Sequence, residues 1–344
     1  MRRREFVSLF AGVAFPSELR RYADPATELE VLRLTDPQHA SFLPRHGASR
    51  RGNFLLYAAD RGSGWQAYRM DLKTGQQQQL TEAAALDPAT LTLLSDDRSF
   101  LYCDGDQLRL MQMGGRAREI GSAAGRTGEL AVSEDGQYCS FAAGPRVRLA
   151  ALGAKPAVTT VCESSSAVAV TQVRPKRTQV LYVREDGAPW LVNFSGQGNR
   201  PLKLDPIAGA QSATVDWTPG GRTFAYLRGS DMREHTPDEN ADRLMAKTSQ
   251  FVGFGMNGDS SVFVGASGSK ASAYVLLLLR VTRREFTLCE HRAKDAAAVR
   301  PVFTPNSQSI LFQSDRHGKP AIYKMQVEKL VESTDSETNG LFNP

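Results

Sequence analysis

A short sequence motif recurs about seven times and constrains the fold of this chain more than any other feature. Each copy consists of a turn rich in Pro, Asp, Gly or Asn, followed by an apolar strand that in most copies ends in an aromatic residue. The copies occupy residues 50–57, 95–102, 133–141, 174–182, 218–226, 257–264 and 304–312. A period of about 40 residues with several short strands per unit is typical of β-propellers. The repeat therefore predicts an all-β chain folded as a seven-bladed β-propeller.

The repeats account for most of the 344 residues, which predicts one closed domain rather than two. We expect the propeller to span residues 28–328, with a leader at 1–20 and a C-terminal tail at 329–344. The last repeat lacks an outer strand, and residues 30–35 near the N-terminus have the pattern of one. Pairing of this N-terminal strand with the last blade would close the ring and leave no open sheet edge to drive association. We therefore expect a monomer.

The leader resembles a twin-arginine export signal. Arg2, Arg3 and Arg4 are followed by Phe6 and a short apolar stretch. Such a signal predicts a periplasmic protein; the alternative is a cytoplasmic one, because the stretch is short and lacks a clear cleavage site. The residues that follow, 16–21, have the pattern of a helical cap. No apolar run is long enough to predict a membrane span.

The composition limits the classes of ligand and macromolecule that this chain is expected to bind. A net charge of +5 fits either a mildly basic surface or a cationic central channel that binds an anionic ligand. The arginines form no single stripe, so we expect no nucleic-acid binding. The 4 cysteines lie in different repeats without the spacing of metal ligands, which predicts buried, reduced thiols.

The innermost strand of each propeller blade lines the central channel, where ligands usually bind. We expect the lining segments at residues 39–48, 87–94, 126–131, 167–173, 211–217, 250–256 and 295–303. The first contains two of the 5 histidines, His39 and His46, which are too few to hold a metal without further ligands. We expect His235 in a polar surface excursion over residues 228–250, His291 in a loop and His317 in a hairpin turn.

Residues 22–35, 65–81 and 301–323 resemble stretches of the oligogalacturonate lyase family, and partly also those of TolB-type propellers. The resemblance implies a seven-bladed propeller that cleaves pectin fragments by β-elimination with a divalent metal such as manganese. It also implies that histidines and a glutamine hold this metal, mostly within a His-Pro-His-Pro-like run before the last turn motif.

This chain departs from the family at those positions. Ala298 and Arg300 replace the two histidines of the run, and Asp295 falls at or near the glutamine. A further ligand histidine falls near Gly253, whereas His39 matches a histidine of the family. We therefore expect no bound metal cofactor, with Arg300 as a fixed cation where the metal would lie.

Three functions remain open. In the first, the channel binds an acidic, pectin-derived oligosaccharide and the metal-dependent elimination is impaired; the binding candidates are Arg300, His39, Arg45, Asp295 and Asp216. In the second, the chain is an active, metal-free lyase that takes its charge and its base from Arg300, His39 or His46. In the third, a TolB-type scaffold binds proteins through its rim. We favour the first, and whether the chain is an enzyme stays open.

Overall fold

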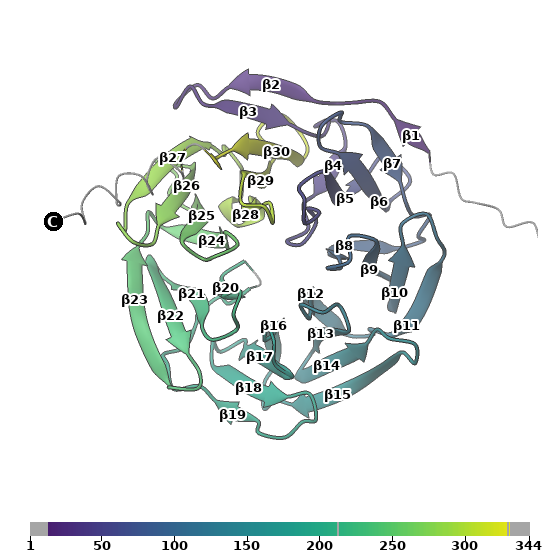
Figure 1. The fold of residues 1–344 in the computed structure, drawn as a ribbon, viewed down its shortest axis with the longest axis vertical. Helices are drawn as coiled ribbons and strands as arrows, with labels where there is room; N and C mark the ends of the chain where they lie inside the picture. Colours follow the sequence, from purple (N-terminus) through teal and green to yellow (C-terminus); the bar gives the residue numbers. More distant parts are fainter. Residues whose placement is uncertain (1–12, 212, 329, 331–344) are drawn as a thin grey trace, which may run out of the picture.

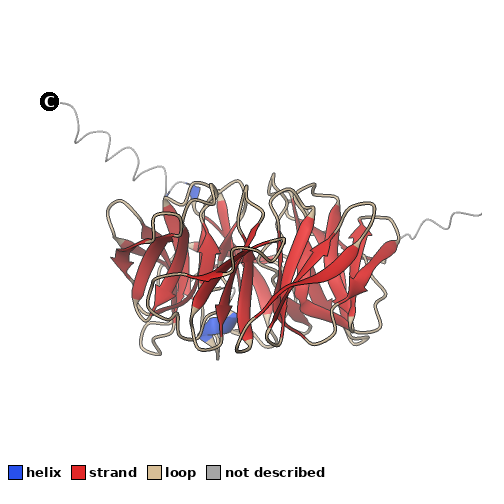
Figure 2. Cartoon of the chain, turned by 90° about the horizontal axis from the view of Figure 1, so that it is seen from below, coloured by secondary structure: helices blue, strands red, loops and turns tan. Residues whose placement is uncertain are grey.

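The computed structural model describes residues 13–211, 213–328 and 330. These residues form seven antiparallel sheets arranged as blades around a central axis (Figure 1). Seen from the side, the blades make a disc with loops on both faces (Figure 2). Helix is nearly absent from the described residues, where η1 (Ala296–Ala298) is a single 3-10 turn. The prediction of an all-β, seven-bladed β-propeller is confirmed.

Each blade is a meander whose first strand lies nearest the channel (Figure 1). The first three blades contain, from the channel outwards, β4 (Ala40–Phe42), β5 (Phe54–Asp60), β6 (Trp65–Asp71), β7 (Gln77–Gln79) and β1 (Ala14–Phe15); β8 (Leu86–Leu93), β9 (Ser99–Asp104), β10 (Gln107–Gln112) and β11 (Ala117–Ser122); and β12 (Arg126–Val132), β13 (Tyr138–Ala143), β14 (Arg146–Ala151) and β15 (Ala157–Glu163). The next three contain β16 (Val168–Val173), β17 (Gln179–Arg184), β18 (Pro189–Asn193) and β19 (Arg200–Pro201); β20 (Val215–Trp217), β21 (Phe224–Arg228), β22 (Asp231–Thr236) and β23 (Ala241–Lys247); and β24 (Phe251–Met256), β25 (Val262–Ser267), β26 (Tyr274–Leu279) and β27 (Glu285–Glu290). The seventh contains β28 (Val302–Phe303), β29 (Ser309–Ser314), β30 (Ala321–Gln326), β3 (Glu30–Arg33) and β2 (Arg20–Ala23).

The recurring motif joins the first and second strands of each blade. In the second blade, the carboxylate of Asp96 accepts hydrogen bonds from the backbone N–H groups of Arg98 and Ser99, both at 2.8 Å, and so closes the turn. The aromatic residues at the end of the motif, such as Tyr182 and Phe312, are completely buried between neighbouring blades. The turn therefore shapes the hairpin, and the aromatic ring packs one blade against the next.

The ring is closed by β3, as the sequence predicted. β3 pairs with β30, with Leu32 opposite Lys324 and Arg33 opposite Tyr323. The last blade therefore combines strands from both ends of the chain (Figure 1). Because β3 covers the outer edge of β30, the backbone groups of that edge find partners within the ring.

The N-terminal segment contributes more to the blades than the sequence predicted. β1 pairs with β7 at the edge of the first blade, and β2 pairs with β3 at the edge of the last. The sheets therefore begin at Ala14, inside the segment assigned to a leader at 1–20. The helical cap expected at 16–21 is wrong, because Arg20 already starts β2, whose backbone pairs with β3 along its whole length. The twin-arginine pattern and the tail, apart from residue 330, lie outside the described residues.

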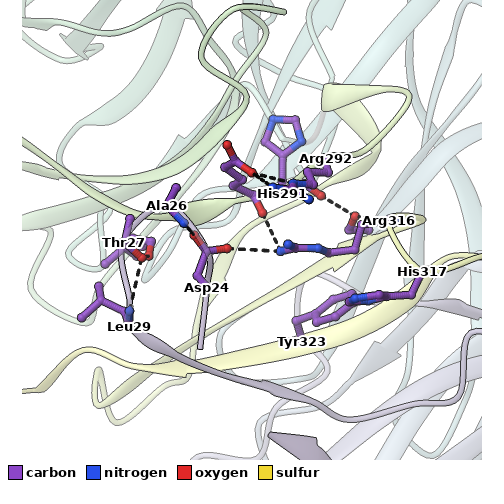
Figure 3. A network of polar contacts seen from close by, with 12 residues as sticks. Asp24, Ala26, Thr27, Leu29, His291, Arg292, Arg316, His317 and Tyr323 are labelled. Atoms are coloured by element: carbon purple, nitrogen blue, oxygen red, sulfur yellow. Dashed lines mark hydrogen bonds and ion pairs between the residues drawn. The ribbon is translucent and has the colours of Figure 1, made fainter. Parts of the chain in front are cut away.

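The loop between β2 and β3 ties this closure to the neighbouring blades (Figure 3). Asp24 and Arg316 form an ion pair with 3.5 Å between Oδ2 and Nη1, and both side chains are almost fully buried. Arg316 Nη1 also donates to the backbone carbonyl of Glu290 at 2.7 Å. Thr27 Oγ1 donates to the carbonyl of Leu288 at 2.7 Å. Since Glu290 and Leu288 belong to β27, the closure is anchored to the sixth blade as well as the seventh.

The fifth blade corrects one sequence interpretation. Residues 228–250 are not a surface excursion but contain the hairpin of β22 and β23, the two outer strands of this blade. The polar side chains that suggested exposure pair with each other, as Arg233 does with Asp242 at 2.6 Å. His235 on β22 is completely buried, and its ring centroid lies 5.4 Å from that of Phe224.

The other histidines and the cysteines lie as expected. His291 follows β27 in a loop, and His317 lies in the β29–β30 turn with Nδ1 2.8 Å from the hydroxyl of Tyr323. All 4 cysteines are free, and three of them are buried. Within the described ranges, no helix is long and apolar enough to cross a membrane.

Candidate functional site

The central channel is lined by the first strand of each blade, at the segments that the sequence predicted. These strands start at one mouth of the channel and lead into the motif turns at the other, which we call the turn mouth. Arg300 lies just before β28 and Thr304 just after it, so these two residues mark opposite ends of the same lining strand. Side chains from blades that are far apart in sequence can therefore meet in the lumen.

Two arginine–carboxylate pairs cross the lumen between blades that are not neighbours. Arg45 of the first blade pairs with Asp216 of the fifth, with 2.6 Å between Nη2 and Oδ2. Arg300 of the seventh blade pairs with Glu129 of the third through Nη2 and Oε1. We call these four residues, together with His46, the lumen cluster. Its two arginines and two carboxylates balance, so with a neutral histidine the cluster carries no net charge.

Arg300 is held in place by more than its ion pair. Its backbone is in the left-handed region, with φ of 50°, which is unusual for a residue with a side chain. Its guanidinium carbon lies 4.8 Å from the ring centroid of Phe42, within the range of a cation–π contact. Its Nε–H is buried and has no hydrogen-bond partner among the residues that the structure describes. Arg300 therefore presents one unsatisfied donor from a well-positioned guanidinium.

His46 is surrounded by the blades, yet its imidazole is exposed to the space within the lumen. This enclosure disfavours the charged ring and lowers the pKa of His46. Asp216 and Glu129 act in the opposite direction, and Arg45 adds to the lowering. The imidazole is consequently neutral at pH 7 and is able to accept a proton.

A cavity of about 400 Å³ opens at the turn mouth, and all seven blades contribute to its lining. Arg45, His46 and Asp216 form its inner end, whereas Arg300 is not part of it. Exposed Arg50 and Glu134 stand at its rim. Three members of the lumen cluster therefore line this cavity, whereas the Arg300–Glu129 pair lies outside its lining.

The structure separates the remaining sequence candidates from the cluster. His39 lies in the turn before β4, where its backbone N–H donates to the carbonyl of Asp36 at 3.2 Å. Asp295 is exposed and caps η1, because its Oδ1 accepts from the N–H of Ala297 at 3.0 Å. Among the described residues, the ion pairs of Arg45 with Asp216 and of Arg300 with Glu129 include neither residue.

Sequence reasoning missed Glu129. It lies in β12, where the pairing with β13 is interrupted between Thr127 and Ala131. Such a bulge re-aims a side chain, and here it brings the carboxylate to Arg300. The neighbouring Arg126 pairs with Asp87 of the second blade and donates to the carbonyl of Gly128. The sequence signal that could have identified Glu129 is its acidic side chain within a segment predicted to line the channel.

The residues at the positions where the resemblance implies metal ligands are not suited to binding a metal ion. Ala298 and Gly253 offer no side-chain donor, and Arg300 is a cation already paired with a carboxylate. The oxygen of Asp295 serves a helix cap. Across the part of the chain that the structure describes, no group of three or more His, Cys, Asp or Glu side chains could hold a metal ion.

Comparisons with known proteins agree with this architecture. No protein-family model matches the chain. It is similar to the oligogalacturonate lyase of Dickeya dadantii (strain 3937), with 24% identity over 90% of this chain and 96% of that protein. Among solved structures, an oligogalacturonate lyase in complex with manganese has a TM-score of 0.83 at 22% identity and covers 92% of this chain and 97% of its own. An oligogalacturonate lyase from Vibrio parahaemolyticus has a TM-score of 0.78 at 20% identity, with 92% and 98% covered. The predicted resemblance to oligogalacturonate lyases is confirmed, and so is the fold.

Proposed function

We propose that this oligogalacturonate lyase-like propeller binds acidic, pectin-derived oligosaccharides in its channel and does not carry out a metal-dependent β-elimination. The observation that carries the proposal is Arg300, a fixed guanidinium in the lumen at a position where the resemblance implies a metal ligand. Its buried Nε–H lacks a partner, which suits a carboxylate or hydroxyl oxygen of a uronate.

The chemistry of elimination explains why binding is favoured over turnover. Removal of the C5 proton of a uronate requires that its carboxylate be neutralised strongly and that a base reach the proton. Neutral His46 has the protonation state of a base. However, Glu129 and Asp216 offset the charge of Arg300 and Arg45, so the cluster has no surplus cation to replace a divalent metal.

The proposal is tested with purified full-length protein and trigalacturonate. We expect calorimetry to detect binding, and Arg300→Ala to weaken it by about tenfold, the size of one charge-assisted hydrogen bond. We expect no ultraviolet absorbance from an unsaturated uronate product, with manganese or with chelator. Binding that is unchanged in Arg300→Ala would contradict the proposed site. A product signal that chelator abolishes would show that a metal-dependent reaction persists.

A further inference from the structure

The carboxylate of Glu129 pairs with the guanidinium of Arg300, as the carboxylate of a ligand would. The two side chains come from the third and seventh blades and meet across the lumen through Oε1 and Nη2. Only 16% of the Glu129 side chain and 17% of the Arg300 side chain are exposed, so solvent screens the pair weakly. A second carboxylate that approaches the same guanidinium face must therefore compete with Glu129.

Arg300 cannot easily turn away from this partner. Its left-handed backbone and its contact with the ring of Phe42 define where the guanidinium points. Pro301 follows directly and restricts the backbone of Arg300 further. A ligand carboxylate that binds Arg300 through Nη2 therefore meets the guanidinium in place, and the group that has to yield there is Glu129.

Glu129 is presented by an irregular part of its strand. Residues 128–130 have no partners in the register of β12 and β13, and Gly128 has a φ of 69°. Arg126 anchors this bulge through its hydrogen bond to the carbonyl of Gly128 and its ion pair with Asp87. The bulge is thus a built feature that delivers one carboxylate to the lumen, and bulges of this kind are frequent beside binding sites.

We propose that Glu129 is a specificity-determining residue: an internal carboxylate that occupies Arg300 and weakens the binding of uronate carboxylates in the channel. The inference rests on the proposed function, since it assigns the residue that limits affinity at the same site. Glu129→Gln keeps the size of the side chain and removes its charge, so Arg300 becomes available to a ligand carboxylate.

The experiment measures the binding of D-galacturonate and of trigalacturonate by calorimetry at low ionic strength. We expect Glu129→Gln to bind D-galacturonate about tenfold more tightly than the wild type. The matched control is Glu163→Gln, which removes the same charge from the same blade, at an exposed position on its outermost strand, β15. We expect this control to change affinity by less than about twofold. The double variant Glu129→Gln/Arg300→Ala should lose the gain.

The outcomes separate the two proposals. If the wild type binds trigalacturonate but Glu129→Gln gains no affinity for either ligand, the role of Glu129 is refuted and the proposed function stands. If the wild type does not bind trigalacturonate but Glu129→Gln gains affinity for D-galacturonate, the role of Glu129 stands and the proposed function fails. An equal gain in Glu163→Gln would refute the role of Glu129, because a general charge effect would then explain it. Thermal melts of each variant verify that it is folded.

Discussion

His235 is a buried histidine whose neutral form the fold requires. Its side chain is completely buried beside Phe224, and within the described part of the chain neither ring nitrogen has a hydrogen-bond partner. Burial lowers its pKa below the ordinary 6.5. A histidine with a lowered pKa in the folded state contributes stability that is present above pH 6.5 and is lost as the pH falls through the folded pKa.

We therefore expect the melting temperature to fall between pH 7 and pH 5, and His235→Leu to reduce this dependence. Leucine keeps an apolar contact with Phe224 and cannot bind the proton that destabilises the fold. His39→Gln is the matched control, since it removes a partly exposed histidine. Thermal melts at both pH values measure the effect. If the melting temperature of His235→Leu falls as steeply between the two pH values as that of the wild type, the role of His235 is contradicted.

The residues of the lumen cluster show how far a sequence can predict a site. Arg45, His46, Asp216 and Arg300 were candidates because they lie in segments predicted to line the channel, and Arg300 also because the resemblance implies a metal ligand at its position. Their partners could not be predicted, because residues from blades three positions apart meet only through the register of each strand. The bulge that brings Glu129 to Arg300 is a local departure from that register, and periodicity does not reveal it.

Among the elements, the β2–β3 hairpin depends on one buried ion pair. Asp24 is 0% and Arg316 3% exposed in their side chains. Removing one partner of such a pair leaves an uncompensated buried charge, which typically costs about 3–5 kcal/mol. The same hairpin carries an exposed pair, Arg21 with Glu30, whose side chains are 71% and 61% exposed.

We expect Asp24→Ala to lower the free energy of unfolding by about 3–5 kcal/mol, as measured by urea denaturation. Glu30→Gln on the same hairpin is the control and should cost about 0–1 kcal/mol, because its pair is solvated. The double variant Asp24→Ala/Arg316→Met should recover part of the loss. Equal effects of Asp24→Ala and Glu30→Gln would show that the buried pair does not anchor the closure.

The elements with a strong apolar pattern were predicted well, and those at the edges were not. The motif strands and the closing strand β3 have buried apolar residues that reveal them. β2 has two arginines and mostly exposed side chains, so no apolar pattern reveals its pairing with β3. β22 and β23 were misread because charged residues that pair with each other look like a solvated insertion.

At the scale of the whole molecule, the metal-binding side chains that the fold brings together determine how metal ions affect its stability. An ion that binds only the folded state raises the melting temperature, and its removal lowers it. Because the described residues offer no group of three metal-binding side chains, we expect chelator and manganese to leave the melting temperature unchanged. Scanning calorimetry of the full chain measures this. A rise with manganese that chelator reverses would mean that a metal binds the folded propeller.

The pairing of β3 with β30 also dictates an order of events during synthesis. Leu32 is translated long before Lys324, the residue opposite it in the neighbouring strand of the same blade. The first six blades have their own strands in sequence and can form as hairpins while the chain grows. The seventh cannot be completed before β30 has been translated, and contacts of such long sequence separation form slowly. Ring closure therefore follows the synthesis of the other six blades, and until then the edge of β3 that β30 will cover stays unpaired.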